Sequence, residues 1–191
     1  MKSVKRVCVF CGSNSGSDPL YTEAVKELGT EMIRRRQDLV YGGGNMGLMG
    51  VIANTIKRGG GKVTGVIPES IASRFDHSEV SELIVTSSMH ERKAKMFELA
   101  GAFIALPGGF GTLEEILEII TWAQLGYHDK PMGFFNIGGF YDGLFKFLEG
   151  AVKQQFIKKS HLNMVVNQNS ADKLLDKINL FQNPKLDKWH N

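Results

Sequence analysis

Apolar residues follow two spacings that alternate along the chain. Runs with apolar residues at successive or every second position, typical of strands, alternate with longer stretches in which they recur every three to four positions, typical of helices. This alternation predicts βα units, and therefore an α/β fold with a doubly wound parallel sheet and helices on both faces. We expect a single domain over residues 1–181 and a loose tail over residues 182–191.

The two spacings also give approximate bounds for the elements. An N-cap is expected at Asp18, before Pro19 at the first helical position. Residues 69–82 show neither spacing and are expected to form a loop with at most a short helical turn. The expected strands cover residues 5–11, 38–41, 62–67, 83–86, 102–106, 132–136 and 164–166. The expected helices carry apolar stripes at Tyr21, Val25, Leu28 and Met32 and at Leu48, Met49, Ile52 and Ile56, or cover residues 89–99, 112–125 (with Leu113, Ile116, Leu117 and Ile120 facing the core), 141–155 and 170–181.

Charge and composition exclude several classes of partner. The net charge of +3 comes from 23 basic and 20 acidic residues, a balance too even to indicate a nucleic-acid or membrane-surface partner. The N-terminal apolar segment is shorter than the roughly 7–15 residues of a signal peptide, and no later run approaches the roughly 20 residues of a membrane span. We therefore expect a cytoplasmic protein.

Cysteines and histidines give no metal-site pattern. Cys8 and Cys11 lie three apart on an expected strand, so their side chains should point to opposite faces as reduced core residues. The histidines show no ligand spacing, and most are expected on the surface or in loops. We expect neither a metal nor a cofactor. These histidines are His77, His90, His128, His161 and His190.

Three glycine-rich loops follow expected strands: CGSNSG (11–16), GGGNMG (42–47) and PGGFGT (107–112). In an open α/β sheet, ligands bind outside the carboxyl ends of the strands, so three such loops at one edge predict a binding site. Their candidate substrate-binding residues are Gly12, Ser13, Gly43, Gly44, Gly108, Gly109, Phe110, Gly111 and Thr112.

The second loop allows a dinucleotide site as an alternative. Residues 42–47 match G-x-G-x-x-G, and Glu69 lies just past the next expected strand. That fingerprint usually follows the first strand of the fold, where this chain has a different loop. The Walker and nucleophile-elbow patterns are not met, because the required Ser or Thr is missing.

The third loop suits a monophosphate but is followed at once by two carboxylates. Backbone N–H groups, the Thr112 hydroxyl and the helix dipole all favour an anion, whereas Glu114 and Glu115 would repel one. Thr112 and Glu115 could instead form a capping box, with Thr112 as N-cap. In that interpretation Glu115 is structural.

Arg92 gives a second pointer to this loop. It shares a helical stripe with Met96 and Leu99, so it should point along the buried face, where a charge needs a partner. The expected helix comes one βα unit before the third loop, so Arg92 can face a phosphate or a carboxylate there. A purely structural Arg92–Glu115 ion pair fits the sequence equally well.

The chain resembles the "Lonely Guy" family of cytokinin-activating phosphoribohydrolases, long mislabelled as lysine decarboxylases. The family motif P-G-G-x-G-T-x-x-E is present at residues 107–115, and the similarity continues through YGGGNMGLMG (41–50), MHERKAKM (89–96) and TWAQLGYHDKP (121–131). The resemblance covers roughly residues 5–160. It implies a Rossmann-like homodimer that hydrolyses the N-glycosidic bond of AMP or N6-modified AMP to a free base and ribose 5-phosphate.

The resemblance also assigns residues. Arg92 and Glu115 are implied as the catalytic pair, and Met89, Lys93, residues 109–112 and Thr121 as part of the nucleotide site. Glu115 would stabilise an oxocarbenium-like sugar or orient water, Arg92 would keep it ionised, and Glu114 is expected in solvent. Residues 74–78 depart from the plant sequences, which leaves the preferred base and side chain open. A non-catalytic nucleotide or cofactor carrier, an NAD-dependent oxidoreductase and a pyridoxal-dependent decarboxylase remain alternatives.

Overall fold

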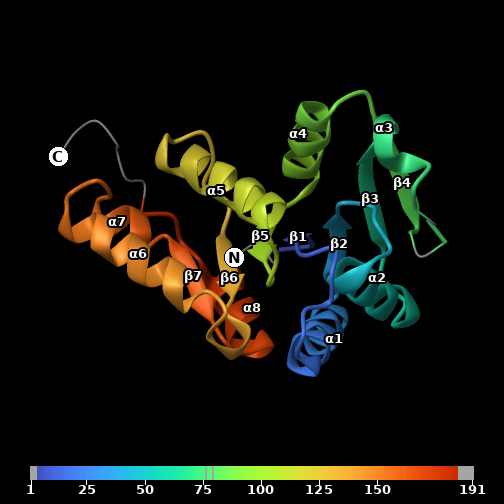
Figure 1. Cartoon of the computed structure of the whole chain (residues 1–191), viewed down its shortest axis with the longest axis horizontal. Coiled ribbons are helices and arrows are strands. Elements are labelled where there is room, and N and C mark those ends of the chain that lie inside the picture. Colours follow the sequence, from blue (N-terminus) through green and yellow to red (C-terminus); the bar gives the residue numbers. More distant parts are fainter. Residues whose placement is uncertain (1–3, 76, 79, 185–191) are drawn as a thin grey trace.

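Seven parallel strands form one sheet in the order β4-β3-β2-β1-β5-β6-β7 (Figure 1). The computed structural model describes residues 4–75, 77–78 and 80–184. From β1 the order runs outward through β2 on one side and β5 on the other, so the chain reverses direction across the sheet at β1. The strands are β1 (Arg6–Phe10), β2 (Asp38–Tyr41), β3 (Val63–Pro68), β4 (Glu82–Thr86), β5 (Ala102–Ala105), β6 (Met132–Phe135) and β7 (Val165–Gln168). The predicted Rossmann-like fold is confirmed.

Helices cover both faces of the sheet (Figure 1). On one face lie α1 (Pro19–Arg34), α2 (Gly47–Arg58) and α8 (Ala171–Leu180). On the other lie α4 (Met89–Leu99), α5 (Phe110–Gln124) and α6 (Asp142–Lys153). The short elements α3 (Glu69–Ala72), η1 (Ile137–Gly139) and α7 (Lys159–Leu162) connect them, and the last two were not predicted.

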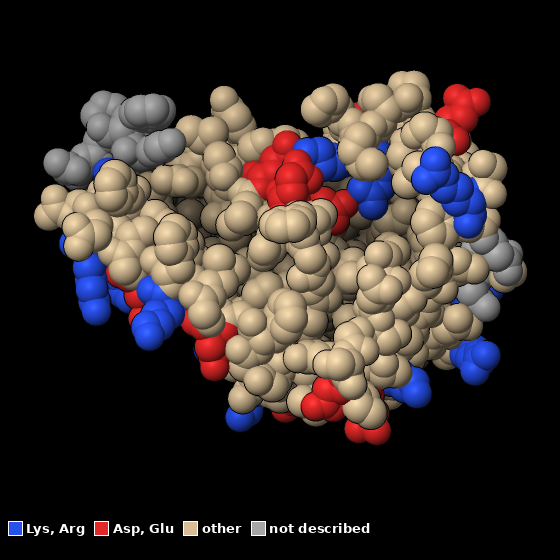
Figure 2. Space-filling model, viewed as in Figure 1, with Lys and Arg blue, Asp and Glu red and all other residues tan. Residues whose placement is uncertain are grey.

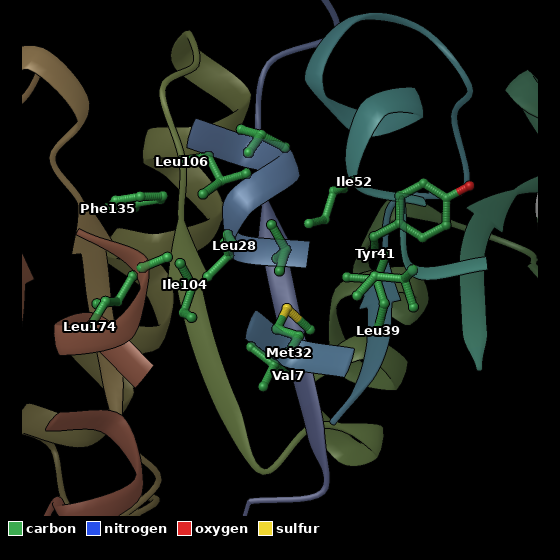
Figure 3. Packing of buried hydrophobic residues seen from close by; sticks show 14 of the residues in the cluster. Val7, Leu28, Met32, Leu39, Tyr41, Ile52, Ile104, Leu106, Phe135 and Leu174 are labelled. Carbon is green, nitrogen blue, oxygen red and sulfur yellow. The ribbon is translucent and has the colours of Figure 1, made fainter. Parts of the chain in front are cut away.

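Alternate residues of β1 supply the two halves of the core. Val7 packs with Leu28 and Met32 of α1 (Figure 3), and Val9 lies in the same cluster. Cys8 and Phe10 face the opposite side of the sheet. Burying one such aliphatic side chain contributes about 1.5–3 kcal/mol to the free energy of folding. The apolar face of each helix therefore holds that helix against the sheet. Cys11 packs on the side opposite to Cys8, and both are free thiols, as predicted.

The N-terminus of α1 is the one expected from the sequence, whereas α5 begins before the expected residue 112. The Asp18 side chain caps α1, since its Oδ1 accepts from the backbone N–H of Leu20 at 2.8 Å. The capping box that the sequence allowed as an alternative for α5 does not form, because the N-cap is Gly109 and the helix begins at Phe110. Thr112 is instead buried in the first turn, beside a glycine at 108 whose missing Cβ leaves room for its hydroxyl.

The face of α5 was also predicted in part only. Ile116 and Ile119 are buried, but Leu117 is 37% exposed, since it lies about 100° around the helix from Ile116. The expectation for the histidines holds for His77 and His128, which lie in loops, and for His90, which is exposed, whereas His161 is buried in α7. Nε2 of His128 lies 2.9 Å from the Ile119 carbonyl.

Three further expectations concern the C-terminal tail, a membrane span and a metal site. Residues 185–191 of the expected tail, including His190, lie outside the described residues. Within the described residues no helix has the length and apolarity needed to cross a bilayer. The same residues contain no group of three or more His, Cys, Asp or Glu placed to hold a metal ion.

Candidate active site

A cavity of about 590 Å³ opens at the carboxyl ends of the central strands, and all three glycine loops line it. This is the position at which ligands bind to open α/β sheets. The predicted site residues that line it are Gly12, Ser13, Gly44, Met89, Arg92, Gly108, Gly109, Phe110, Gly111, Thr112 and Glu115.

Arg92 and Glu115 form an ion pair at the wall of the cavity. Nη1 of Arg92 lies 2.6 Å from Oε1 of Glu115, and the two side chains are only 12% and 13% exposed. Nε of Arg92 donates to the Val66 carbonyl at 3.0 Å, which fixes the plane of the guanidinium. Gly42 makes room for it, because a Cβ there would collide with Nη2.

The environment of Glu115 is mainly set by burial. Burial raises the pKa of the Glu115 carboxyl above its ordinary value, and the Arg92 guanidinium opposes that rise. The carboxyl is therefore suited to exchange a proton nearer neutral pH than an exposed glutamate. Burial also raises the pKa of the Cys11 thiol, which lines the same cavity, so Cys11 is a poor candidate for a thiolate nucleophile.

The N-terminus of α5 and the first loop form an anion cradle, which we define as residues 12–16 and 108–112. The helix begins at Phe110, so the N–H groups of its first turn have no partner within the helix and the dipole favours negative charge. Gly12 N donates to the Pro107 carbonyl at 3.0 Å, which holds the two loops together. Together they supply N–H and hydroxyl donors but no lysine or arginine.

Three predicted site residues do not line the cavity. Gly43 lies between two lining residues but is not one itself, and its carbonyl oxygen lies 3.0 Å from Nδ1 of His77. Lys93 is one residue, or about 100°, around α4 from Arg92 and pairs instead with Glu114 and, at 3.1 Å, with Glu118. Thr121 is exposed on α5, where its hydroxyl donates to the Leu117 carbonyl at 2.7 Å.

Charges meet where α4 approaches α5, and Figure 2 shows acidic and basic side chains in contact at this place. Burial lowers the pKa of Lys93, but hydrogen bonds to Glu114 and Glu118 outweigh it and raise the pKa above its ordinary value. The Glu114 side chain is 55% exposed, in agreement with the prediction. Lys93 therefore serves to join the two helices.

An apolar lobe of the cavity was missed from the sequence except for Met89. We define it as Met49, Ile71, Phe75 and Met89, which all line the cavity. Met49 was assigned to the core because helical spacing shows which residues share a face but not what they face. Ile71 and Phe75 lie in the stretch without periodicity, so no pattern indicated them. Further lining residues that were not predicted as site residues are Cys11, Asn14, Ser15, Gly16, Tyr21, Gly42, Leu48, Pro107 and Phe140.

The parts of the cavity have a definite order. Gly108 lies against Gly12 and Thr112 in the anion cradle, whereas Gly42 lies against Arg92. Beyond it, Gly44 lies against the end of Met49 and the ring of Phe75. The cavity thus combines donor-rich loops, the Arg92–Glu115 pair and an apolar part, a set that suits a ligand with an anionic group, a polar centre and a flat apolar ring.

Comparisons with known proteins agree with this arrangement. Residues 49–178 match the protein family described as "Possible lysine decarboxylase". The chain is 50% identical over 175 residues, 91% of this chain and 82% of the relative, to cytokinin riboside 5′-monophosphate phosphoribohydrolase LOG1 of Arabidopsis thaliana. It is 47% identical over 184 residues, 96% of this chain and 84% of the relative, to LOG7 of the same plant.

Solved structures of low sequence identity share the fold. The molybdenum cofactor binding protein from Rippkaea orientalis superposes with a TM-score of 0.70 and 21% identity, covering 93% of this chain and 96% of that chain. The Moco carrier protein from Chlamydomonas reinhardtii gives a TM-score of 0.66 and 18% identity, covering 91% of this chain and 98% of that chain. At this identity the similarity establishes the fold alone.

Proposed function

The chain belongs to the family of cytokinin riboside 5′-monophosphate phosphoribohydrolases, and we propose that its cavity hydrolyses the N-glycosidic bond of AMP or N6-modified AMP. The products are the free base and ribose 5-phosphate. The observation that carries the assignment of the site is the Arg92–Glu115 ion pair, held 2.6 Å apart between the anion cradle and the apolar lobe.

We assign the 5′-phosphate to the anion cradle. Backbone N–H groups at a helix N-terminus bind phosphate without a lysine or arginine, because several aligned N–H groups and the helix dipole act together. Thr112 Oγ1 and the side chain of Ser13 can add hydroxyl donors. This placement puts the ribose over Glu115 and directs the base toward the apolar lobe.

Glu115 is assigned the chemistry at the anomeric carbon. As the C1′–N9 bond breaks, the sugar becomes oxocarbenium-like, and a nearby carboxylate stabilises that charge. Water then forms the new C1′–O bond and gives a proton to the carboxylate, while the base leaves with the bond electrons and takes up a proton from solvent, to which the carboxyl returns its own. Arg92 keeps Glu115 oriented and favours its ionised form, which burial alone would disfavour.

A purely structural role for the pair is less well supported. Glu115 is free of the capping box, since α5 starts at Phe110, and a structural ion pair would not need to line a cavity. A buried ion pair is also weak evidence for stability, because desolvation offsets the attraction between the charges.

Two other enzyme classes fit the described cavity poorly. A pyridoxal-dependent decarboxylase needs a lysine for its Schiff base, and none of the described residues that line the cavity is a lysine. A dinucleotide site would use Glu69 for a ribose hydroxyl, but Glu69 is not part of the described cavity wall.

A homodimer is the second part of the proposal. None of the described residues of α6 is buried, although the helix is amphipathic, and Phe147 on it is 68% exposed. On α5, Leu117 is exposed as well. We propose that a second copy covers these two helices, because burying exposed apolar side chains is favourable. Thr121 would then lie at the interface rather than in the cavity of its own chain.

A cytoplasmic location, expected from the N-terminal sequence, belongs to the same proposal.

The direct test is product formation. Incubation with AMP and with N6-isopentenyl-AMP should release ribose 5-phosphate together with adenine or the modified base, measured by chromatography. Nucleotide binding without any release would instead support a non-catalytic carrier. A spectral change on titration with NADH, without release of a base, would support the oxidoreductase.

A further inference from the structure

His77 joins two walls of the cavity that are far apart in sequence. Its Nδ1 lies 3.0 Å from the carbonyl oxygen of Gly43, and its Nε2 lies 2.9 Å from the carbonyl oxygen of Ala72. Carbonyl oxygens only accept hydrogen bonds, and a neutral imidazole carries a single N–H. The imidazolium donates to both carbonyls at once, whereas either neutral tautomer bonds only one of them.

The two carbonyls belong to segments that line the cavity. Gly43 lies between Gly42, which faces Arg92, and Gly44, which lies against the ring of Phe75. Ala72 ends α3 and follows Ile71, and Phe75 comes one turn later. His77 therefore connects the glycine loop of one wall to the Ile71–Phe75 part of the apolar lobe.

As far as the structure describes it, the α3 segment lies near the surface of the protein. None of the four residues of α3 is buried, and its N-cap Pro68 makes no side-chain hydrogen bond. Local turn bonds, such as Phe75 N to the Ala72 carbonyl at 3.3 Å, shape the segment but do not tie it to the glycine loop. The hydrogen bonds of His77 to the Gly43 and Ala72 carbonyls do so.

We propose that His77 is a positioning residue that sets the width of the apolar lobe and thereby the preference of the enzyme for a substituted or a plain adenine. This inference rests on the proposed function. His77 acts through Phe75 and Ile71, so it should affect binding of the base more than the reaction at the anomeric carbon, which occurs at Glu115.

The test compares His77→Ala with wild type on AMP and on N6-isopentenyl-AMP. For the substituted nucleotide, KM should rise about tenfold with kcat nearly unchanged, which is the mark of lost ground-state binding. For AMP, which leaves the outer part of the lobe empty, KM should change less than about threefold. His77→Gln, whose amide NH2 can donate to one of the two carbonyls, should be intermediate. Ser73→Ala, an exposed residue of the same segment, is the matched control and should behave as wild type.

Each outcome decides between the two proposals. If the wild type releases no ribose 5-phosphate from either nucleotide, the proposed function fails. If the wild type is active and His77→Ala changes both substrates equally, or changes kcat alone, the inference about His77 is wrong. If His77→Ala does not fold, Phe75→Ala must show the same change in substrate ratio, and an unchanged ratio overturns the inference.

Discussion

Nη1 of Arg92, on α4, lies 2.6 Å from Oε1 of Glu115, on α5, although the two helices follow different strands. Both side chains are largely buried, yet both line an open cavity. The pair therefore keeps a carboxylate accessible to a ligand and oriented by a fixed cation. All but the last of the predictions below follow from this contact or its environment.

Glu115→Gln should abolish most turnover. The amide keeps the size of the side chain and can still accept from Arg92, but it can neither carry the negative charge nor take a proton, so we expect a loss in kcat of about 10²–10⁴. Nucleotide binding and Tm should stay close to wild type, as measured by calorimetry and thermal unfolding. Glu114→Gln, one residue away and 55% exposed, is the control and should retain activity. An active but destabilised Glu115→Gln would assign Glu115 a structural role.

Arg92→Ala should lose activity and some stability. The substitution leaves a partly buried carboxylate without its cation, and breaking a buried pair typically costs about 3–5 kcal/mol. Denaturant unfolding and kcat/KM should both report the change. Lys95→Ala, on the same helix but paired with Glu98 at 3.0 Å, should alter neither by much. Wild-type rates in Arg92→Ala would remove Arg92 from the mechanism.

Gly42→Ala should act on the reaction through Arg92. The added methyl would collide with Nη2, so the guanidinium must shift from both Val66 and Glu115. We expect kcat to fall at least tenfold, or about 1.4 kcal/mol in activation free energy. Gly101→Ala is the control, because its Cβ would meet only Val4 at 3.5 Å and Arg6 at 3.6 Å, which are ordinary contacts. Equal activities of the two variants would contradict the role given to Gly42.

The pH profile of kcat/KM should fall on its acidic side with the pKa of Glu115. If the ionised carboxylate is the active form, kcat/KM is high above its pKa and falls as pH drops through it. Because burial raises that pKa, the limb should lie above the pH at which an exposed glutamate titrates, about 4.3. A limb at or below that value would show that burial does not control the group.

The same shift predicts the sign of a stability effect. A carboxyl whose folded pKa is raised stabilises the fold most below its unfolded pKa and loses that contribution as pH rises through the folded value. Glutamine does not titrate. The difference in Tm between Glu115→Gln and the wild type, although small, should therefore move in favour of the variant as pH rises from the unfolded to the folded pKa of Glu115, as followed by thermal unfolding at a series of pH values.

Phe147→Asp should dissociate the proposed dimer. A charge at the centre of an apolar contact is costly to desolvate, so sedimentation should show a monomer where the wild type is a dimer. Leu180→Asp, an exposed apolar residue at the end of α8 on the other side of the sheet, is the control and should not change the mass. A monomeric wild type would overturn this part of the proposal.

The site residues in the glycine loops could be predicted from the sequence. Those whose position depends on how a helix is oriented could not. The three glycine loops could be located because each follows a strand and glycine is needed at tight strand-to-helix turns. Lys93 was assigned to the cavity by resemblance, but a residue next to Arg92 on a helix must face elsewhere. The apolar lobe was missed, since Ile71 and Phe75 lie in a segment that shows no period.

By itself the sequence determined the alternation of strands and helices, the cap at Asp18 and the opposite faces of Cys8 and Cys11. Spacing and capping act over a few residues, so they can be read without coordinates. Only the tertiary structure decided that α5 begins before Thr112 and that Glu115 faces Arg92. The Arg92–Glu115 contact depends on how α4 and α5 lie relative to each other on the sheet. The spacing of apolar residues within either helix does not determine that relative position.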